Sequence, residues 1–342
     1  MMNRANVLRG LAVIGAGAAF SGPAAAANAR RFDVHHHYVS PEWMVALGAE
    51  SRVHHFPGLE IFGGWSAAAA IEAMDAAGVG TSVLSTTTPG IWFGDAAQTR
   101  RLARNMNEFG AKLVADHKGR YGLFAVLPLP DVPSSLTEVA YALDTLKADG
   151  ISVLTSYGTK WLGDASFEPL WQELDRRHAV VFAHATAPDC CRGLLVPHIE
   201  ATVVEFNTDV ARTIISLIES GAAGRYPNIR FVFSHGGGTI ADLAGGYFRV
   251  QADTKTLAST VDPSTKLGHL RRFYYDTAGS ANPVQMQALK MVVPATQILF
   301  GTDYPWEKPV NIATGLAGCG FTDAELAGIN LENGLRLLPQ FR

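Results

Sequence analysis

Residues 32–38 read Phe-Asp-Val-His-His-His-Tyr, and the rest of the chain is organised around this stretch. Its apolar positions predict a short buried strand. Residues two apart on a strand point to the same face, so we expect His35 and His37 to lie side by side while His36 points the opposite way. Two neighbouring imidazoles can bind a borderline metal such as Zn²⁺, although a pair of ordinary buried histidines would give the same pattern.

The segment before this strand has the features of a secretory signal peptide. It begins with a basic region, continues with an apolar run over residues 11–20 and ends in small residues over 24–29. The run is shorter than the roughly 20 apolar residues of a membrane-spanning helix. We therefore expect a leader over residues 1–29 and an exported protein, which would stay cytoplasmic if the leader is not cleaved. A disordered alanine-rich N-terminus is the alternative interpretation.

The composition of the chain excludes several classes of protein. Hydrophobic residues make up 48% and charged residues 17%, which predicts a large core rather than disorder. A net charge of −3 argues against a nucleic-acid or anionic-membrane partner. Three cysteines, two of them adjacent, do not form a disulfide framework. Residues 30–342 are enough for two average domains or one large barrel.

Strand-like and helix-like segments alternate along residues 30–342, which favours the barrel. Near-continuous apolar runs in the strands predict a parallel sheet covered by helices. Eight such units predict a single α/β domain, a closed (β/α)₈ barrel. The stretch between the first strand and residue 64 is expected to be irregular. The eight predicted strands are 32–38, 81–88, 121–128, 151–157, 179–186, 229–235, 273–278 and 297–303.

Polar residues follow the apolar runs at the ends of four predicted strands. The first strand ends with His35 and His37, the fifth with His184, the sixth with His235 and the eighth with Asp303. In a (β/α)₈ barrel the carboxyl ends of all strands meet on one face, where the chemistry takes place. The sequence therefore predicts that these five side chains form one site.

Five motifs after residue 30 form a familiar set: Asp-Val-His-His-His at 33–37, Val-Phe-Ala-His at 181–184, Phe-Ser-His-Gly-Gly at 233–237, Phe-Gly-Thr-Asp-Tyr-Pro at 300–305 and the tail at 329–337. With them the chain resembles the metal-dependent amidohydrolase superfamily, in the branch that contains aminocarboxymuconate-semialdehyde decarboxylase and related aromatic-acid decarboxylases. Within this branch, residues 83–90 and 148–157 look most like 6-methylsalicylate decarboxylases.

The resemblance implies that His35, His37, His184 and Asp303 hold one divalent metal ion, with a further position open to water or substrate. Three imidazoles and a carboxylate suit Zn²⁺, and Mn²⁺ is the alternative where substrate oxygens add to the shell. His235 is expected to act as an acid or base beside the metal. A fifth ligand or an orienting residue is the alternative interpretation of His235.

Three functions are compatible with these ligands. The first is a non-oxidative decarboxylase (a carboxy-lyase) of a small hydroxylated aromatic or related unsaturated carboxylic acid, whose ring carbon is protonated by His235 or Asp303. The second is a hydrolase of a lactone, an amide or a carbon–carbon bond, in which Asp303 takes a proton from water. The third is a binding protein that kept the metal without turnover. The resemblance at 83–90 and 148–157 favours the decarboxylase.

Other expectations are less specific. Trp65, Trp161 and Phe300 could wall an aromatic pocket, although aromatic residues are more often part of the core. His54 and His55 lie in the first loop, where substrate contact and plain surface fit equally well. For partners we expect a small-molecule acid, neither nucleic acid nor membrane, and the chain could form a homodimer.

The leader makes the first testable prediction. N-terminal sequencing of protein recovered from its own cells should give a mature chain that begins near Ala29 or Arg30, because cleavage follows small residues. Recovery of the functional protein with Met1 intact would contradict the prediction.

Overall fold

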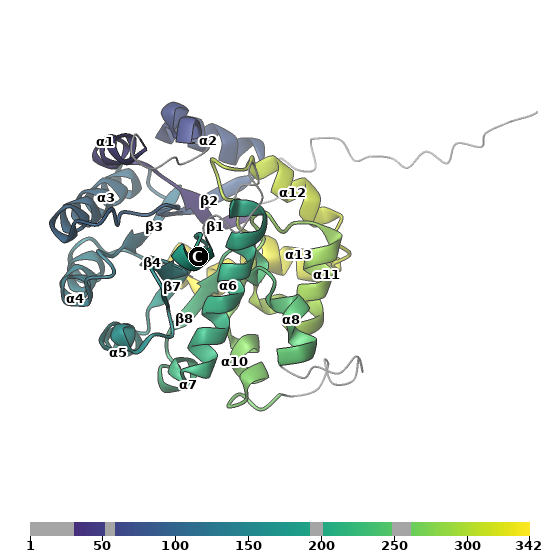
Figure 1. The fold of residues 1–342 in the computed structure, drawn as a ribbon. Coiled ribbons are helices and arrows are strands. Elements are labelled where there is room, and N and C mark those ends of the chain that lie inside the picture. Colours follow the sequence, from purple (N-terminus) through teal and green to yellow (C-terminus); the bar gives the residue numbers. More distant parts are fainter. Residues whose placement is uncertain (1–30, 52–58, 192–200, 248–260) are drawn as a thin grey trace, which may run out of the picture.

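The computed structural model describes residues 31–51, 59–191, 201–247 and 261–342, and these residues form the predicted (β/α)₈ barrel (Figure 1). Eight strands make one sheet in the order β1-β2-β3-β4-β7-β8-β9-β10, and the neighbours pair in parallel. The predicted leader and the pair His54 and His55 lie outside the described residues. The strands of the barrel are β1 (Arg31–His37), β2 (Val79–Ser85), β3 (Tyr121–Val126), β4 (Gly150–Leu154), β7 (Val180–His184), β8 (Arg230–Phe233), β9 (Tyr274–Asp276) and β10 (Ile298–Leu299).

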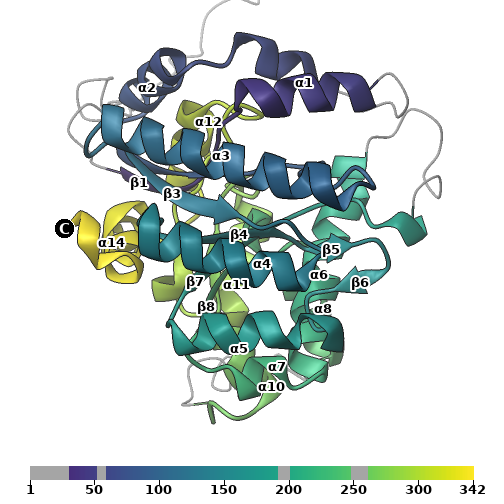
Figure 2. The ribbon, with the colours of Figure 1, turned by 90° about the vertical axis from the view of Figure 1, so that its left-hand side faces the viewer.

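Helices surround the strands on the outside of the barrel (Figures 1 and 2). Several begin at short polar side chains that accept a backbone N–H of the first turn, among them Ser40, Ser66 and Asp95. No helix in the described parts of the chain is long and apolar enough to cross a lipid bilayer. The helices are α1 (Pro41–Glu50), α2 (Ala67–Ala76), α3 (Ala96–Asp116), α4 (Val132–Ala140), α5 (Glu168–Arg176), α6 (Ala201–Glu219), α7 (Ala222–Arg225), α8 (Ile240–Tyr247), α10 (Lys266–Arg272), α11 (Pro283–Val292), α12 (Pro309–Ala317), α13 (Asp323–Ala327) and α14 (Asn333–Leu337).

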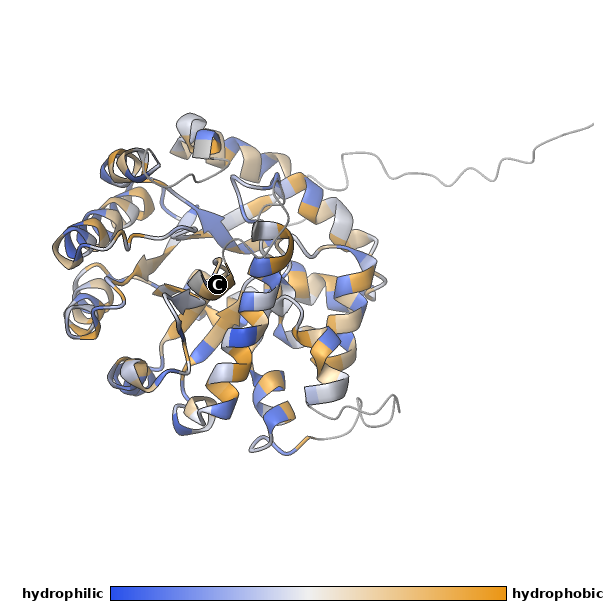
Figure 3. Cartoon of the chain, in the orientation of Figure 1, coloured by the Kyte–Doolittle hydropathy of each residue, from blue (hydrophilic) through white to orange (hydrophobic). Residues whose placement is uncertain are grey.

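The core has two parts. The larger part lies between the strands and the helices, and the helices in the foreground of Figure 3 carry both hydrophobic and hydrophilic residues, as expected when one face is buried. The smaller part includes Phe32, Phe124 and Phe182 and packs against the C-terminal segment. There Phe341 contacts Phe32, with their ring centroids 5.3 Å apart. The C-terminal segment therefore lies near the beginnings of the strands, away from their carboxyl ends.

Backbone hydrogen bonds between β1 and the segment after β10 close the barrel. Val34 N donates to Phe300 O at 3.0 Å, and His37 N donates to Tyr304 O at 2.8 Å. Asp303 N donates to His35 O at 2.8 Å in the opposite direction. The first and last strands thus become neighbours, and this places His35 and His37 beside Asp303.

The buried carboxylate of Asp33 reinforces this closure. Its Oδ1 accepts the backbone N–H of His35 and of Thr302, each at 3.0 Å. Its Oδ2 accepts the hydroxyls of Thr302 at 2.7 Å and Ser82 at 3.1 Å, and lies 3.0 Å from His36 Nδ1. One side chain therefore joins β1, β2 and the segment after β10.

The structure differs from the predicted elements in places where local patterns are weak. Residues 41–50, expected to be irregular, form the helix α1. This helix buries only three side chains, so its sequence shows only a weak helical spacing of apolar residues. The helix α12 was likewise not predicted. Of the predicted strand 297–303, only Ile298–Leu299 pairs with the neighbouring strand β9. The residues after Leu299 instead form backbone hydrogen bonds with β1. Ser156–Tyr157, placed in the fourth strand, instead pairs antiparallel with Lys160–Trp161.

The Asp33 contacts predict a large effect on stability. Asp33→Ala would leave buried donors without partners, each costing about 1–3 kcal/mol, so the free energy of unfolding should fall by about 3–5 kcal/mol. Asp116→Ala is the matched control, since the Asp116 carboxylate is exposed and pairs only with Lys112. Urea unfolding followed by circular dichroism measures both. Equal midpoints for the two variants would show that Asp33 does not hold the closure.

Candidate metal centre

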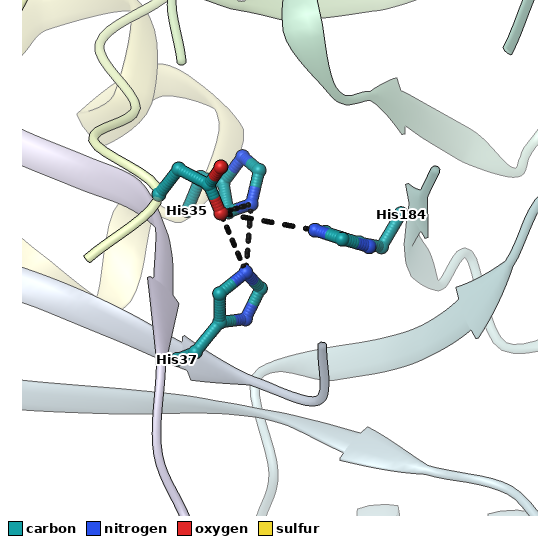
Figure 4. A group of neighbouring side chains, drawn as sticks. His35, His37 and His184 are labelled. Atoms are coloured by element: carbon teal, nitrogen blue, oxygen red, sulfur yellow. Dashed lines mark hydrogen bonds and ion pairs between the residues drawn. The ribbon is translucent and has the colours of Figure 1, made fainter. Parts of the chain in front are cut away.

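Three imidazoles and one carboxylate meet at the carboxyl ends of the strands (Figure 4). They belong to His35 and His37 of β1, to His184 of β7 and to Asp303 after β10, and their ligand atoms all lie within 4.8 Å of one another. His37 Nε2 is 2.9 Å from Asp303 Oδ1 and 3.0 Å from His35 Nε2. His184 Nε2 is 3.8 Å from the same carboxylate oxygen. The structure thus brings together the four residues expected to bind a metal.

The second ring nitrogen of each histidine faces an acceptor outside the cluster. His37 Nδ1 donates to Ser85 O at 3.2 Å, and His184 Nδ1 donates to Ala185 O at 2.8 Å. His35 Nδ1 donates to a carboxylate oxygen of Asp276 at 2.8 Å. Because these oxygens only accept, each Nδ1 carries a proton, and a ring that bears no second proton presents the lone pair of Nε2 to the cluster.

Inward-facing lone pairs and a carboxylate require a positive charge between them. Burial lowers the pKa of His37 and of His184 to about 4, so both are neutral at pH 7. Burial also disfavours a charge on His35, but the charges and hydrogen bonds of Asp276 and Asp303 outweigh it and raise the pKa of His35 to about 10. Without a metal, a proton on His35 therefore supplies the positive charge.

Burial alone would raise the pKa of the Asp303 carboxyl. The positive charge of His35, whose Nε2 lies 3.1 Å from Asp303 Oδ1, outweighs burial and holds this pKa well below its usual range. His184 Nε2 is buried without a hydrogen-bond partner. An ionised carboxylate, an unused imidazole nitrogen and two further nitrogens are the donors that Zn²⁺ or Mn²⁺ takes. The residues present fit a divalent ion.

His235 lies beside this cluster without belonging to it. It follows β8, and its ring centroid is 5.3 Å from that of His35 and 5.6 Å from that of His184. His235 Nδ1 donates to Ala278 O at 3.2 Å, while Nε2 is buried and has no partner. Burial lowers the pKa of His235. A neutral imidazole with one unused nitrogen next to the cluster is the arrangement that an acid–base residue needs.

Two residues of the site have a backbone conformation that residues other than glycine rarely adopt. His235 has φ of 56° and Asp303 has φ of 65°, both in the left-handed region. Such residues persist only where the surrounding contacts hold them, and they are common at functional sites.

Asp276, the last residue of β9, contacts two site histidines and was not predicted. Besides its bond to His35, its Oδ1 accepts the backbone N–H of His235 at 2.9 Å and of Ala278 at 3.0 Å. The pattern that identified Asp303 would have found it, since Asp276 is also an acidic residue at the carboxyl end of a predicted strand.

The other predicted residues have varied positions. His36 points away from the cluster, as expected, and stacks on Tyr304 with ring centroids 4.7 Å apart. Of the aromatic residues, Trp65 lies at the site, where its Nε1 donates to His37 O at 3.1 Å. Trp161 instead donates to Asp209 at 2.6 Å, and Phe300 is fully buried in the core.

Trp306, which was not predicted, is a second aromatic residue on this side of the barrel. Its Nε1 donates to Thr87 Oγ1 at 3.0 Å, just beyond the end of β2. Its ring packs edge-on against Phe62, with centroids 5.1 Å apart. Because Trp306 follows Asp303 by three residues, the same loop supplies a cluster carboxylate and an indole.

The family model for Amidohydrolase matches residues 32–340, and the chain belongs to this family, as its motifs predicted. Decarboxylase yanB of Aspergillus niger is 35% identical over 334 residues, which cover 91% of this chain and 88% of that protein. The 6-methylsalicylic acid decarboxylase of Penicillium expansum is 34% identical over 284 residues, covering 80% of this chain and 85% of that protein.

Solved structures share the fold. One is dihydroxybenzoic acid decarboxylase from a Polaromonas species, with bound manganese and the inhibitor 2-nitroresorcinol. It has a TM-score of 0.76 and 20% sequence identity, and the match covers 91% of this chain and 97% of that one.

The cluster predicts how the metal content depends on His184. His184→Ala removes one of the four expected ligands, so we expect metal affinity to fall by more than the roughly 10–100-fold that loss of an orienting residue costs. Elemental analysis of purified, folded protein measures this. His117→Ala, which removes a partly exposed imidazole outside the cluster, should keep about one ion per chain. A His184→Ala protein with a full complement of metal would contradict the assignment.

Proposed function

We propose that this protein is a metal-dependent non-oxidative decarboxylase of a small hydroxylated aromatic carboxylic acid. The observation that carries the proposal is the combined site: a His₃Asp cluster with the unused Nε2 of His235 beside it. The same donors would serve a hydrolase. The choice between the reactions is supported by the relatives, which are decarboxylases at 34–35% identity over most of the chain.

A divalent ion held by His35, His37, His184 and Asp303 would supply Lewis-acid stabilisation of negative charge on the substrate's oxygens. The three nitrogen donors favour Zn²⁺. The manganese in the Polaromonas decarboxylase supports Mn²⁺ as the alternative. Loading apoprotein with each ion and comparing turnover would decide between them.

The protein's own residues must deliver one proton in each turnover, because decarboxylation replaces a carboxylate on the ring by a hydrogen. We assign this transfer to His235. Its Nδ1–H bond to Ala278 O fixes the ring, and the lone pair on Nε2 can accept a proton from the substrate's hydroxyl group. Nε2–H then protonates the ring carbon that bears the carboxylate. As CO₂ leaves, the electron pair of the broken carbon–carbon bond stays with the ring and restores its aromaticity as a phenolate, which takes one proton from water to give the phenol.

Asp303 is the second candidate for this proton transfer. Its carboxylate already faces three imidazole nitrogens, and its pKa is held well below the usual range. A carboxylate that resists protonation is a poor proton donor at neutral pH, so the contacts favour Asp303 as a ligand and His235 as the acid–base residue.

Two tryptophans at this end of the barrel suit an aromatic substrate. The indole Nε1 atoms of Trp65 and Trp306 are both hydrogen-bonded to neighbouring residues, so each ring has a fixed orientation at this end of the barrel. Indoles offer large flat surfaces to a substrate ring at little cost in conformational entropy. Both side chains are partly exposed, which leaves area for contact.

The proposal predicts which products form. Metal-loaded protein incubated with 6-methylsalicylate and other salicylates labelled in the carboxyl group should release labelled CO₂ and the corresponding phenol, and a chelator should abolish the release. Lactones and amides serve as the comparison substrates. Hydrolysis of these without CO₂ release from any aromatic acid would overturn the decarboxylase and support the hydrolase.

A further prediction concerns His235. A residue that moves a proton in the transition state contributes about 10²–10⁴-fold, so His235→Asn should lower kcat by that factor and change KM little. Metal content should stay near one ion per chain, because His235 is not a ligand. A metal site that is empty in the variant would show that His235 is a ligand. A near-normal kcat would show that Asp303 or water, rather than His235, transfers the proton.

A further inference from the structure

We propose that Asp276 is a positioning residue that orients both the metal ligand His35 and the acid–base residue His235 through one carboxylate. Its action on His35 follows from the contacts alone, and its action on His235 rests on the proposed decarboxylase function.

The two carboxylate oxygens of Asp276 have different partners. Oδ2 accepts the Nδ1–H of His35 at 2.8 Å. Oδ1 accepts the backbone N–H groups of His235 at 2.9 Å and Ala278 at 3.0 Å. The side chain has no exposed surface, so water cannot replace any of these contacts. Asp276 is therefore the one described residue whose side chain bonds to both histidines.

The bond to Oδ2 decides which nitrogen of His35 can bind a metal. A carboxylate offers no hydrogen to Nδ1, so Nδ1 carries the proton and a neutral His35 directs the lone pair of Nε2 at the cluster. Loss of this constraint would allow the other tautomer, in which Nε2 carries the proton and cannot serve as a ligand.

The bonds to Oδ1 hold His235 in place. His235 has φ of 56°, and a residue with a Cβ keeps this left-handed conformation only when neighbouring contacts fix it. Asp276 binds its N–H directly. It also binds the N–H of Ala278, whose carbonyl accepts from His235 Nδ1. The backbone and the ring of His235 are therefore both tied to the same carboxylate.

Asparagine cannot replace Asp276 in this arrangement. If its oxygen faced His35, its NH₂ would point at two backbone N–H donors. If it were turned round, its NH₂ would donate to His35 Nδ1 and move the ring proton to Nε2. Asp276→Asn therefore loses either the contact with His35 or the contacts with the backbone N–H groups of His235 and Ala278, while the size of the side chain stays the same.

Gly301 provides the space for this contact. A Cβ added at Gly301 would lie 2.8 Å from Asp276 Cβ and 3.0 Å from His35 Cβ, both too close for unbonded carbons. The backbone of Gly301 is fixed, since its N–H and its carbonyl both bond to Thr277 Oγ1 at 3.1 Å. Gly301→Ala should therefore push the pair apart without changing any polar group.

The test compares Asp276→Asn and Gly301→Ala with the control Glu138→Gln. Glu138 is also a buried carboxylate with several donors, from Arg104 and Asn107, but it lies on α4 away from the site. Competition with a chromophoric chelator measures Zn²⁺ affinity. We expect both site variants to bind Zn²⁺ about 10–100-fold more weakly than the wild type, and Glu138→Gln to bind it within about 2-fold.

The second measurement is turnover at saturating metal. Asp276→Asn should keep a kcat at least about 10-fold below the wild type with little change in KM, because His235 is displaced even when the ion is bound. In an Asp276→Asn/His235→Asn double variant, kcat should be no lower than in His235→Asn alone, because both changes remove the same step.

Each outcome has a definite meaning. Unchanged Zn²⁺ affinity in Asp276→Asn overturns the action on His35. Full kcat at saturating metal, or additive losses in the double variant, overturns the action on His235. Should Asp276→Asn fail to fold by circular dichroism, Gly301→Ala gives the same two measurements. If the wild-type protein releases no CO₂ from any aromatic acid, the proposed function fails while the affinity measurement still decides the role toward His35.

Discussion

The hydrogen bonds at Asp33 are the interaction on which the rest of this structure depends. Asp33 joins β1 to β2 and to the segment after β10, and it does so with a carboxylate that no water reaches. A buried carboxylate is tolerated only when its acceptor positions are filled, and here five donors fill them. Because Thr302 is one of the partners, the residue that follows it, Asp303, is held next to β1.

Negative and positive groups alternate in the site, which forms where β1 meets the segment after β10. Asp276, His35 and Asp303 follow one another as carboxylate, imidazolium and carboxylate when no metal is bound. The positive member keeps two buried negative groups close together, so the protein's own contacts hold the donor atoms of the cluster near one another. His37 and His184 stay neutral, since burial outweighs the attraction of Asp303. A divalent ion bound here would replace one buried positive charge by another.

Much of this arrangement could be predicted from the sequence because the buried strands of a barrel have a simple sequence pattern. Runs of apolar residues that end in His184, His235 and Asp303 mark both the strands and the face on which they end. The alternation of side chains along β1 correctly separated His36 from its neighbours. Parallel strands of a barrel must bring their ends together, so the fold class predicted that these side chains meet. The resemblance to the family then selected four of them as the expected metal ligands.

The remaining features depend on contacts that no local pattern records. The partners Asp33 and Thr302 are 269 positions apart, and the sequence around either residue does not indicate that it contacts the other. Asp276 lies inside the predicted strand 273–278 after two tyrosines rather than a purely apolar run, so the pattern marked it less clearly than Asp303, and its partner His35 is 241 positions away. The helix α1 buries too few side chains to show a clear period, and its form is decided by packing against α3.

The join between β1 and the last part of the barrel also has a consequence for the order of events during synthesis. His35 and His37 leave the ribosome early, but their neighbour Asp303 and the packing residue Phe341 come much later. Contacts of such sequence separation form slowly and expose unpaired strands in the meantime. The four donors expected to hold an ion are therefore brought together only once the barrel has closed, whereas in small zinc domains the ion itself drives folding.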